Sequence, residues 1–267
     1  GQEKKVSTRL KEASRTPIFI GVDQEGSRVR RKREEQGFPN SSSEEELGRG
    51  TPPLYEEEGK KTGALLHALG INLNFAHCLD VNVNPESPAI GALGRSFSAT
   101  PEEVAAHGLA YAKGLYSNGV LPCYKHFPGH GSAMNDTHLG LADITDTWKE
   151  YELLPYRIIL PQSPPAMVMP GHIAHKNISG DMPASLSGEV IQGMLRRDLD
   201  WTGVVITDDL QMQAIEGRYD FKESIRLAVL AGADILLFGN NLRHDPREAK
   251  KAHGYLMELV KEGKIDK

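Results

Sequence analysis

The stretch GVLPCYKHF, residues 119–127, has the pattern of a buried strand that ends in polar side chains. Its first residues are apolar without alternation, which is typical of a parallel strand covered on both faces. Lys125 and His126 follow near its end, and the next residues, PGHG, are too rich in Gly and Pro for a helix. The pattern predicts an α/β fold in which polar residues collect at the strand ends.

Further apolar stretches alternate with helical patterns along the chain. The other apolar stretches span 17–23, 71–81, 164–173, 203–209 and 233–239, and the helical patterns span about 59–70, 101–118, 147–160, 187–199, 221–231 and 246–262. Six βα units predict a TIM-type (β/α)8 barrel that is incomplete or irregular, with its first strand expected before residue 1. A doubly wound open sheet is the alternative, although no GxGxxG follows the first strand. We expect residues 1–267 to form a single catalytic barrel domain.

Composition excludes several classes of protein. The hydrophobic content of 39% and charged content of 25% are ordinary for a globular chain. The net charge of −5 gives no overall basic field for nucleic acid, and no apolar run is long enough to predict a membrane span. Cys78 and Cys123 both lie in apolar runs, so we expect two buried free thiols, as in a reducing compartment.

Polar residues recur where the predicted strands end. In a βα barrel the carboxyl ends of the strands converge on one mouth, where active sites are built. We therefore expect one shared site from residues that all stand at such ends, namely Asp23, Asp80, Lys125, His126, His172, Asp208 and Asp209.

Two carboxylates and one histidine suggest acid–base and nucleophilic chemistry. Asp208 follows the apolar run GVVIT, and a partly desolvated carboxylate on a rigid strand suits a nucleophile or a metal ligand. Asp209 fits a helix N-cap better. Asp136 and His138 stand two residues apart, and a carboxylate that holds an imidazole fixes its tautomer and raises its basicity. His138 is thus a candidate general acid and base.

The remaining basic residues suit the binding of oxygen atoms. The forks of Arg31 and Arg95 suit carboxylate, amide carbonyl or sugar oxygens, and Lys125 and His126 could donate to hydroxyl groups of a substrate, although each alone could equally be an ordinary solvated side chain. His126 and His130 have the i, i+4 spacing of helical metal ligands, but the Pro and Gly between them break a helix. No HExxH motif occurs. We expect neither a metal nor an organic cofactor.

Five motifs together resemble a known family. GVDQEGSRVRR, LNFAHCLDVN, GRSFS, KHFPGHG followed by DTH, and VVITDDLQM resemble the motifs of the bacterial β-N-acetylhexosaminidases of glycoside hydrolase family 3, from about residue 5 to about residue 245. The resemblance implies retaining hydrolysis, with Asp208 as nucleophile and His138, held by Asp136, as acid and base. It also implies sugar-binding roles for Asp23, Arg31, Arg95, Lys125 and His126.

The resemblance further implies a substrate and a setting. We expect removal of terminal β-linked N-acetylglucosamine from peptidoglycan-derived fragments in the cytoplasm, with a carbohydrate as the partner and an oligomeric state that the sequence does not specify. The chain departs from the family pattern at Ser27, His77 and Ser132, where Gly, Pro and Asp are usual. Two alternatives remain, an inactive sugar-binding relic and a metal-dependent hydrolase on the same barrel.

Overall fold

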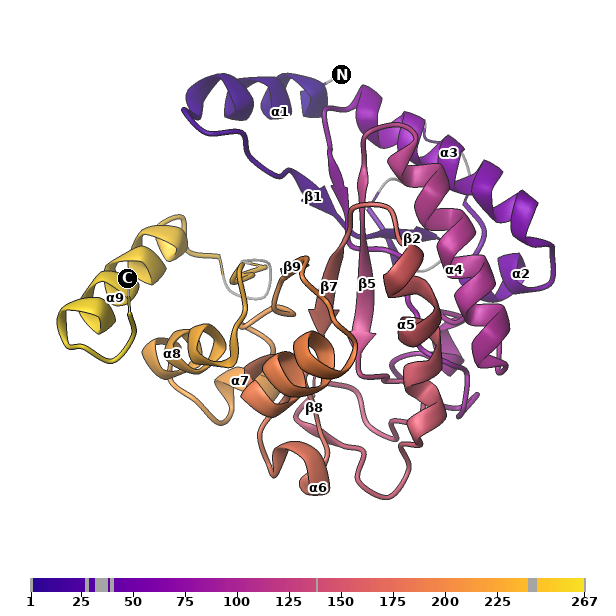
Figure 1. Ribbon diagram of the computed structural model, residues 1–267. Coiled ribbons are helices and arrows are strands. Elements are labelled where there is room, and N and C mark those ends of the chain that lie inside the picture. Colours follow the sequence, from indigo (N-terminus) through magenta and orange to yellow (C-terminus); the bar gives the residue numbers. More distant parts are fainter. Residues whose placement is uncertain are drawn as a thin grey trace.

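A parallel sheet forms the centre of the computed structural model, which describes residues 2–26, 29–31, 38, 41–137, 139–239 and 244–266 (Figure 1). Its strands, in spatial order, are β1 (Gly21–Val22), β4 (Leu73–Asn74), β5 (Leu121–Phe127), β7 (Met167–Pro170) and β9 (Val204–Val205). All neighbours pair in parallel. A parallel bridge between Ile206 and Ile235 adds the 233–239 stretch beside β9. All six predicted apolar stretches therefore lie in one parallel sheet.

The larger helices fall on the predicted helical patterns. They are α3 (Pro52–Ala68), α4 (Pro101–Tyr116), α5 (Leu154–Ile159), the π-helix η6 (Glu189–Asp198), α8 (Phe221–Ala231) and α9 (Glu248–Lys261). Ser187 accepts a hydrogen bond from the Val190 N–H at the start of η6. Thr100 is the N-cap residue of α4 but makes no side-chain hydrogen bond there, and the Ser98 hydroxyl accepts the Thr100 N–H.

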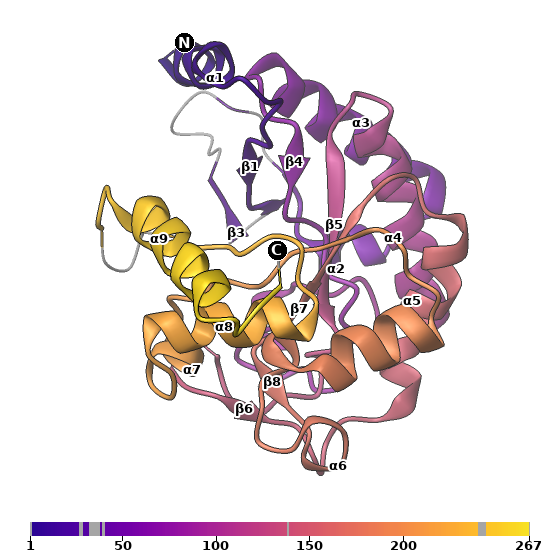
Figure 2. The same cartoon turned by 60° about the vertical axis from the view of Figure 1, so that its left-hand side comes forward.

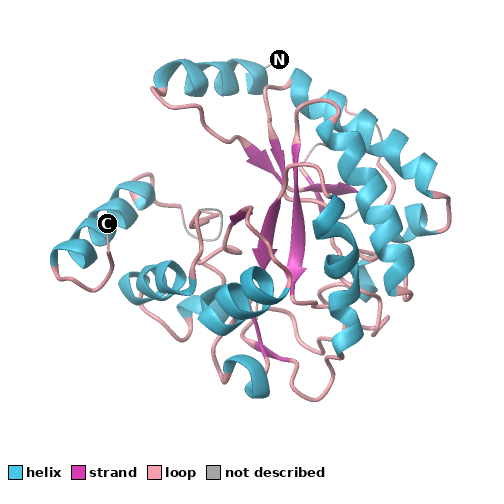
Figure 3. Ribbon diagram, viewed as in Figure 1, coloured by secondary structure: helices cyan, strands magenta, loops and turns pink. Residues whose placement is uncertain are grey.

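The remaining elements are the N-terminal helix α1 and a set of short helices and strands. They are α1 (Gln2–Ala13), β2 (Gln24–Gly26), β3 (Val29–Arg30), α2 (Glu44–Gly48), η2 (Gly91–Leu93), β6 (Ala142–Asp143), η3 (Glu150–Leu153), η4 (Leu160–Gln162), β8 (Ile173–Ala174), α6 (Lys176–Ser179), η5 (Ala184–Leu186) and α7 (Gln213–Glu216). Figure 3 shows α3, α4 and α5 stacked along one side of the sheet. Within the described residues, no helix is long and apolar enough to cross a membrane.

The sheet separates two apolar layers because successive side chains of a strand point to opposite faces. Cys123, Met167 and Met169 pack together on the inner face, whereas Tyr124 and Val168 belong to the core beneath the helices. Lys125 follows Cys123 by two residues, so the alternation of β5 directs both to the inner face. Both cysteines are free and buried, as predicted.

Close contact between α3 and α4 depends on glycine. A Cβ atom at Gly59 would lie 2.3 Å from the carbonyl oxygen of Tyr111, and one at Gly114 would lie 2.2 Å from that of Glu56. Any larger residue would push the helices apart, because such distances are well inside van der Waals contact. Glycine at these two positions therefore allows the close packing of α3 against α4.

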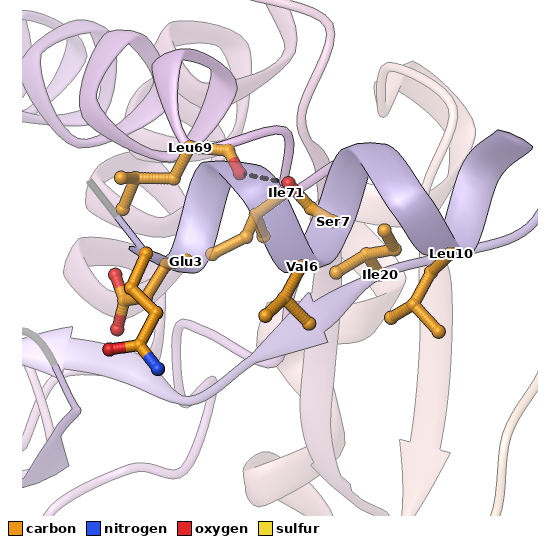
Figure 4. Close-up of a pocket in the computed structure, with 8 residues that line it drawn as sticks. Glu3, Val6, Ser7, Leu10, Ile20, Leu69 and Ile71 are labelled. Atoms are coloured by element: carbon orange, nitrogen blue, oxygen red, sulfur yellow. Dashed lines mark hydrogen bonds between the residues drawn. The ribbon is translucent and has the colours of Figure 1, made fainter.

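The barrel is incomplete within the described residues. There β1 pairs only with β4, and no hydrogen bond joins it to the 233–239 stretch. Figure 2 shows α1 and α9 bordering this open side. An apolar pocket of about 310 Å³ lies under α1 between Val6, Leu10, Ile20 and Ile71, where Ser7 donates a hydrogen bond to the Leu69 carbonyl (Figure 4). The residues that precede β1 and β4 line it, so it lies at the amino ends of these strands.

Candidate active site

The polar residues predicted to share a site come from one end of the parallel sheet. Asp23 directly follows β1, Lys125 and His126 lie in the last three residues of β5, and Asp208 lies three residues beyond β9. Because these strands run in the same direction, their carboxyl ends meet at the same edge. The apolar pocket under α1 lies at the opposite edge.

A buried lysine joins two carboxylates at this edge. The Lys125 Nζ atom lies 2.6 Å from Oε1 of Glu25 and 3.2 Å from Oδ1 of Asp23. Asp23 is about one-third exposed and also lies 3.8 Å from the guanidinium of Arg31, whose side chain is 54% exposed. The structure therefore brings Asp23, Arg31 and Lys125 together, with Lys125 innermost.

Arg95 reaches the same buried carboxylate from the loop before α4. Its Nε and Nη2 atoms each donate to a Glu25 oxygen at 2.8 Å, and its Nη1 atom donates to the Ala89 carbonyl at 2.8 Å. A forked guanidinium–carboxylate pair of this kind is both strong and geometrically specific. We call Asp23, Glu25, Arg95 and Lys125 the ionic cluster.

Mutual attraction keeps the ionic cluster charged. Burial alone raises the pKa of Glu25, but the charges of Arg95 and Lys125 outweigh it and hold the pKa well below its usual range. Burial lowers the pKa of Lys125, and Glu25 and Asp23 more than reverse this, so the pKa lies above its ordinary value. These groups are therefore ionised at neutral pH.

Asp80 fixes His126, the next residue on β5. Its Oδ2 atom lies 2.8 Å from the His126 Nδ1 atom, and its Oδ1 atom accepts the His130 backbone N–H at 2.7 Å. A carboxylate partner makes Nδ1 the proton-bearing nitrogen and leaves Nε2 for another partner. Burial raises the pKa of Asp80, but His126 and the other donors outweigh it and lower the pKa. Asp80 is therefore an anionic anchor for the loop that starts at His126.

Asp208 has a different environment. One carboxylate oxygen accepts the Asp209 N–H at 2.7 Å, and within the described residues no cationic atom lies within 4 Å of it. Burial raises its pKa, but the charges of His172, His126 and Lys125, with the Asp209 N–H, lower it to about 2. Asp208 is thus an ionised carboxylate whose other lone pairs accept no hydrogen bond from the described residues.

Hydrogen bonds to His172 and Asp209 hold the segment around Asp208. The His172 Nε2 atom lies 2.8 Å from the Asp209 carbonyl oxygen, and its Nδ1 atom lies 2.7 Å from Oγ of Ser185. Because a carbonyl only accepts, Nε2 carries a proton there. The Asp209 carboxylate accepts the N–H groups of Gln211 and Gly239, so it closes the turn and ties it to the neighbouring strand. We call His172, Ser185, Asp208 and Asp209 the carboxylate corner.

The loop after β5 is anchored at its base. A Cβ atom at Gly131 would lie 1.7 Å from the Val81 carbonyl, so only glycine permits this close approach. Trp148 donates to the Pro128 carbonyl at 3.3 Å. Asp136 is half-buried further along the loop, and Leu139 donates its N–H to the Asp136 carbonyl. The predicted acid and base His138 lies outside the described residues.

Two residues of the site were absent from the predicted set or had no assigned function. Glu25 stands two residues after Asp23, and period-two alternation along an extended segment could have placed both on one face. His172 was expected at the mouth, but its link between Ser185 and Asp209 has no signature in the sequence. The assigned roles of Asp23, Arg31, Arg95, Lys125, His126, Asp136, His138 and Asp208 stay predictions.

Two buried groups of residues have the donor types of a metal site. One comprises Cys78, Asp80 and His126, and the other comprises Glu25, Glu44 and Cys78. In the first, Asp80 already accepts hydrogen bonds from His126 and His130. In the second, Glu25 is paired with Arg95 and Lys125, whose positive charges oppose a cation. The expectation of a metal-free protein stays a prediction.

Comparisons with known proteins agree with this architecture. The family model described as the glycosyl hydrolase family 3 N-terminal domain matches residues 2–267. The chain belongs to glycosyl hydrolase family 3. It is similar to beta-hexosaminidase A of Pseudoalteromonas piscicida, with 35% identity over 92% of this chain and 44% of the relative. It is also similar to beta-hexosaminidase LpqI of Mycobacterium tuberculosis, with 36% identity over 83% of this chain and 58% of that protein.

A solved structure from the same family extends the match to the fold. The family 3 beta-N-acetylglucosaminidase of a Paenibacillus species matches with a TM-score of 0.91 and 36% identity, over 100% of this chain and 51% of that one. The family resemblance and the TIM-type fold with an incomplete barrel are therefore confirmed. This family 3 chain spans about half the length of these relatives.

Proposed function

We propose that this chain supplies the catalytic barrel of a retaining glycoside hydrolase that removes terminal β-linked N-acetylglucosamine. Membership of family 3 and the names of the similar proteins support this reaction class. The observation that carries the proposal is Asp208, a carboxylate ionised at neutral pH that accepts one hydrogen bond and has no ion-pair partner among the described residues. Such a carboxylate is available to attack an electrophilic carbon.

The proposed reaction has two displacements. In the first, an Asp208 oxygen bonds to the anomeric carbon while the bond to the leaving oxygen breaks, and His138 donates a proton to that oxygen. In the second, His138 takes a proton from water, which attacks the same carbon and releases the Asp208 carboxylate. Asp136 orients the His138 ring throughout.

The remaining residues of the edge would hold the sugar. Lys125 and Arg95 would supply donors, His126 would offer its Nε2 atom, and Asp23 would accept from ring hydroxyls on its exposed side. Arg31, on the rim beside Asp23, would close over the bound ring. Binding through several fixed groups would orient the anomeric carbon toward Asp208.

The proposal extends to the natural substrate and the cellular compartment. We propose peptidoglycan-derived fragments that end in N-acetylglucosamine, acted on in the cytoplasm. The support is the motif resemblance described above together with two buried free thiols, which persist in a reducing compartment.

The decisive experiment compares two aryl glycosides and then traps the intermediate. We expect turnover of an aryl β-N-acetylglucosaminide, little turnover of the matching β-glucoside, and no effect of a chelator. Mass spectrometry of the acid-quenched enzyme should find the sugar on the peptide that contains Asp208. A relic would bind the sugar without turnover, a metal enzyme would lose activity with chelator, and a label on another residue would remove Asp208 from the nucleophile role.

A further inference from the structure

We infer that Glu25 is a positioning residue that holds Arg95 and Lys125, the two innermost cations of the site, in their sugar-binding geometry. The inference rests on the proposed function and extends it to a residue outside the predicted site. Both cations reach the Glu25 carboxylate directly, at 2.8, 2.8 and 2.6 Å. No other residue in the described part of the chain contacts both of them at these distances.

Engaged hydrogen-bonding atoms, not burial, separate this role from substrate contact, because Glu25 is 3% exposed and Lys125 is 4% exposed. The Lys125 ammonium has three donors, and among the described residues Glu25 and Asp23 take two of them, which leaves one for a sugar. Both Glu25 oxygens are already occupied by guanidinium and ammonium donors, so its effect on a ligand passes through Arg95 and Lys125.

The charges explain why one carboxylate has so much influence. Lys125 is 4% exposed and Arg95 is 13% exposed, and like charges at short range repel strongly where little water enters. Glu25 lies between them and offsets this repulsion. Without it, of the contacts among described residues, Arg95 would keep only its bond to the Ala89 carbonyl, and Lys125 would keep only Asp23 at 3.2 Å.

A neighbouring carboxyl group provides a matched comparison. Glu44, the first residue of α2, is also buried, and its Oε1 atom accepts the Cys78 N–H at 3.0 Å. Burial, with the nearby negative charge of Glu25, raises the pKa of Glu44 well above its usual value, which favours its neutral form. Glu44 forms no ion pair among the described residues, and an amide in its place keeps the acceptor for the Cys78 N–H.

The test uses the full chain with Glu25→Gln and, as control, Glu44→Gln. We expect kcat/KM on an aryl β-N-acetylglucosaminide to fall roughly 10- to 100-fold for Glu25→Gln, mainly through KM, since charged hydrogen bonds to the two cations are lost. Glu44→Gln should stay within about twofold. Equal losses in both variants, or a rate within about threefold for Glu25→Gln, would overturn the inference.

A pH profile separates positioning from general damage. The charged and titratable groups that act on Lys125 include Asp23 after β1, Glu25 on β2, Glu44 on α2, Cys78, Arg95 before α4 and Asp208 beyond β9. When Glu25 loses its charge, the largest cause that raises the pKa of Lys125 is removed, so this pKa falls. Activity of Glu25→Gln should then decline further between about pH 7 and pH 9.5, by roughly tenfold more than wild type. A uniform loss at every pH would contradict positioning.

If wild type shows no glycosidase activity, the proposed function fails, and urea unfolding then tests the role of Glu25. In folded Glu25→Gln, Lys125 should hold its proton less tightly than in the unfolded chain. The difference in urea midpoint between wild type and Glu25→Gln should therefore become smaller as pH rises. If Glu25→Gln does not fold, Glu25→Asp keeps the charge on a shorter side chain and should lower kcat/KM without the alkaline decline. A constant deficit, or an alkaline decline in Glu25→Asp, would reject the inference.

Discussion

Glu25 and Asp208 are two ionised carboxylates at one edge of the same sheet, yet their surroundings are opposite. Glu25 accepts from the guanidinium of Arg95 and the ammonium of Lys125, and its lone pairs are engaged. Asp208 accepts a single backbone N–H, and in the described part of the chain no cation lies within 4 Å of it. A carboxylate whose oxygens are engaged positions other groups, whereas one with free lone pairs is available for chemistry.

The two regions also differ in what holds them. The ionic cluster depends on charge, so loss of one partner leaves a buried ion without compensation. The carboxylate corner depends on hydrogen bonds through His172, which links Ser185 to the Asp209 carbonyl. We therefore expect charge-removing substitutions to lower stability and sugar binding in the first region, and the rate of the chemical step in the second.

The largest effect should follow from Asp208→Ala. We expect turnover of an aryl β-N-acetylglucosaminide to fall by about 10³-fold or more, roughly 4 kcal/mol of transition-state stabilisation. The free energy of unfolding should change by less than about 1 kcal/mol, because no ion pair in the described residues is broken. Steady-state kinetics and urea unfolding on one preparation check both. Near-native turnover, or a large loss of stability, would erase the contrast with Glu25.

Arg95→Met should produce the next largest effect, and on stability. It leaves Glu25 buried with one cation instead of two, which should cost about 3 kcal/mol of unfolding free energy. The control is Arg49→Met, because Arg49 also pairs with a glutamate, Glu45 at 3.0 Å, but is 75% exposed. That change should cost less than about 0.5 kcal/mol. Similar costs at both sites would show that burial does not set the difference.

His138→Ala should separate substrates by their leaving groups. A poor leaving group needs a proton in the transition state and should lose about 10²-fold in kcat/KM, whereas an activated aryl group should lose much less. The first displacement of the activated substrate would still depend on Asp208. Parallel assays of a chitobiose-type substrate and a dinitrophenyl glycoside measure the split. Equal losses on both would count against His138 as the acid.

The sequence predicted the framework well because its signals are local. Uniformly apolar runs such as GVLPCYKHF and GVVITDD predicted parallel strands, and the sheet contains them in sequence order. Strand lengths were overestimated, since β9 covers only Val204–Val205 of the predicted 203–209. The π-helical form of η6 was also missed, because helical periodicity does not distinguish it from an α-helix.

The site was predictable only where a residue stands at a strand end. Asp23, Lys125 and Asp208 have that signal, and alternation could have added Glu25. The pairing of Arg95 with Glu25 joins residues 70 positions apart, and the link from His172 to Asp209 spans 37. Such contacts depend on how loops pack after the sheet has formed, and a single sequence carries no local signal for them.

A third carboxyl group, that of Glu152, is buried and has no ion-pair partner among the described residues. Glu152 is fully buried on η3, where its carboxyl group accepts the Lys149 N–H at 3.1 Å. A Cβ atom placed on Gly129 would lie 2.9 Å from the Cβ atom of Glu152. Burial raises the pKa of Glu152 to about 7 and outweighs the hydrogen bond from the Lys149 N–H, which lowers it. Since the pKa in the unfolded chain is 4.5, the folded chain holds this proton more tightly, and stability should fall as pH rises from about 4.5 to about 7.

Glu152→Gln should remove that decline and raise the unfolding free energy by about 2 kcal/mol at pH 8, with little effect at pH 4. Urea unfolding of both proteins across this range measures the difference, and a gap that does not vary with pH would show that Glu152 is ionised in the folded protein like Glu25 and Asp208.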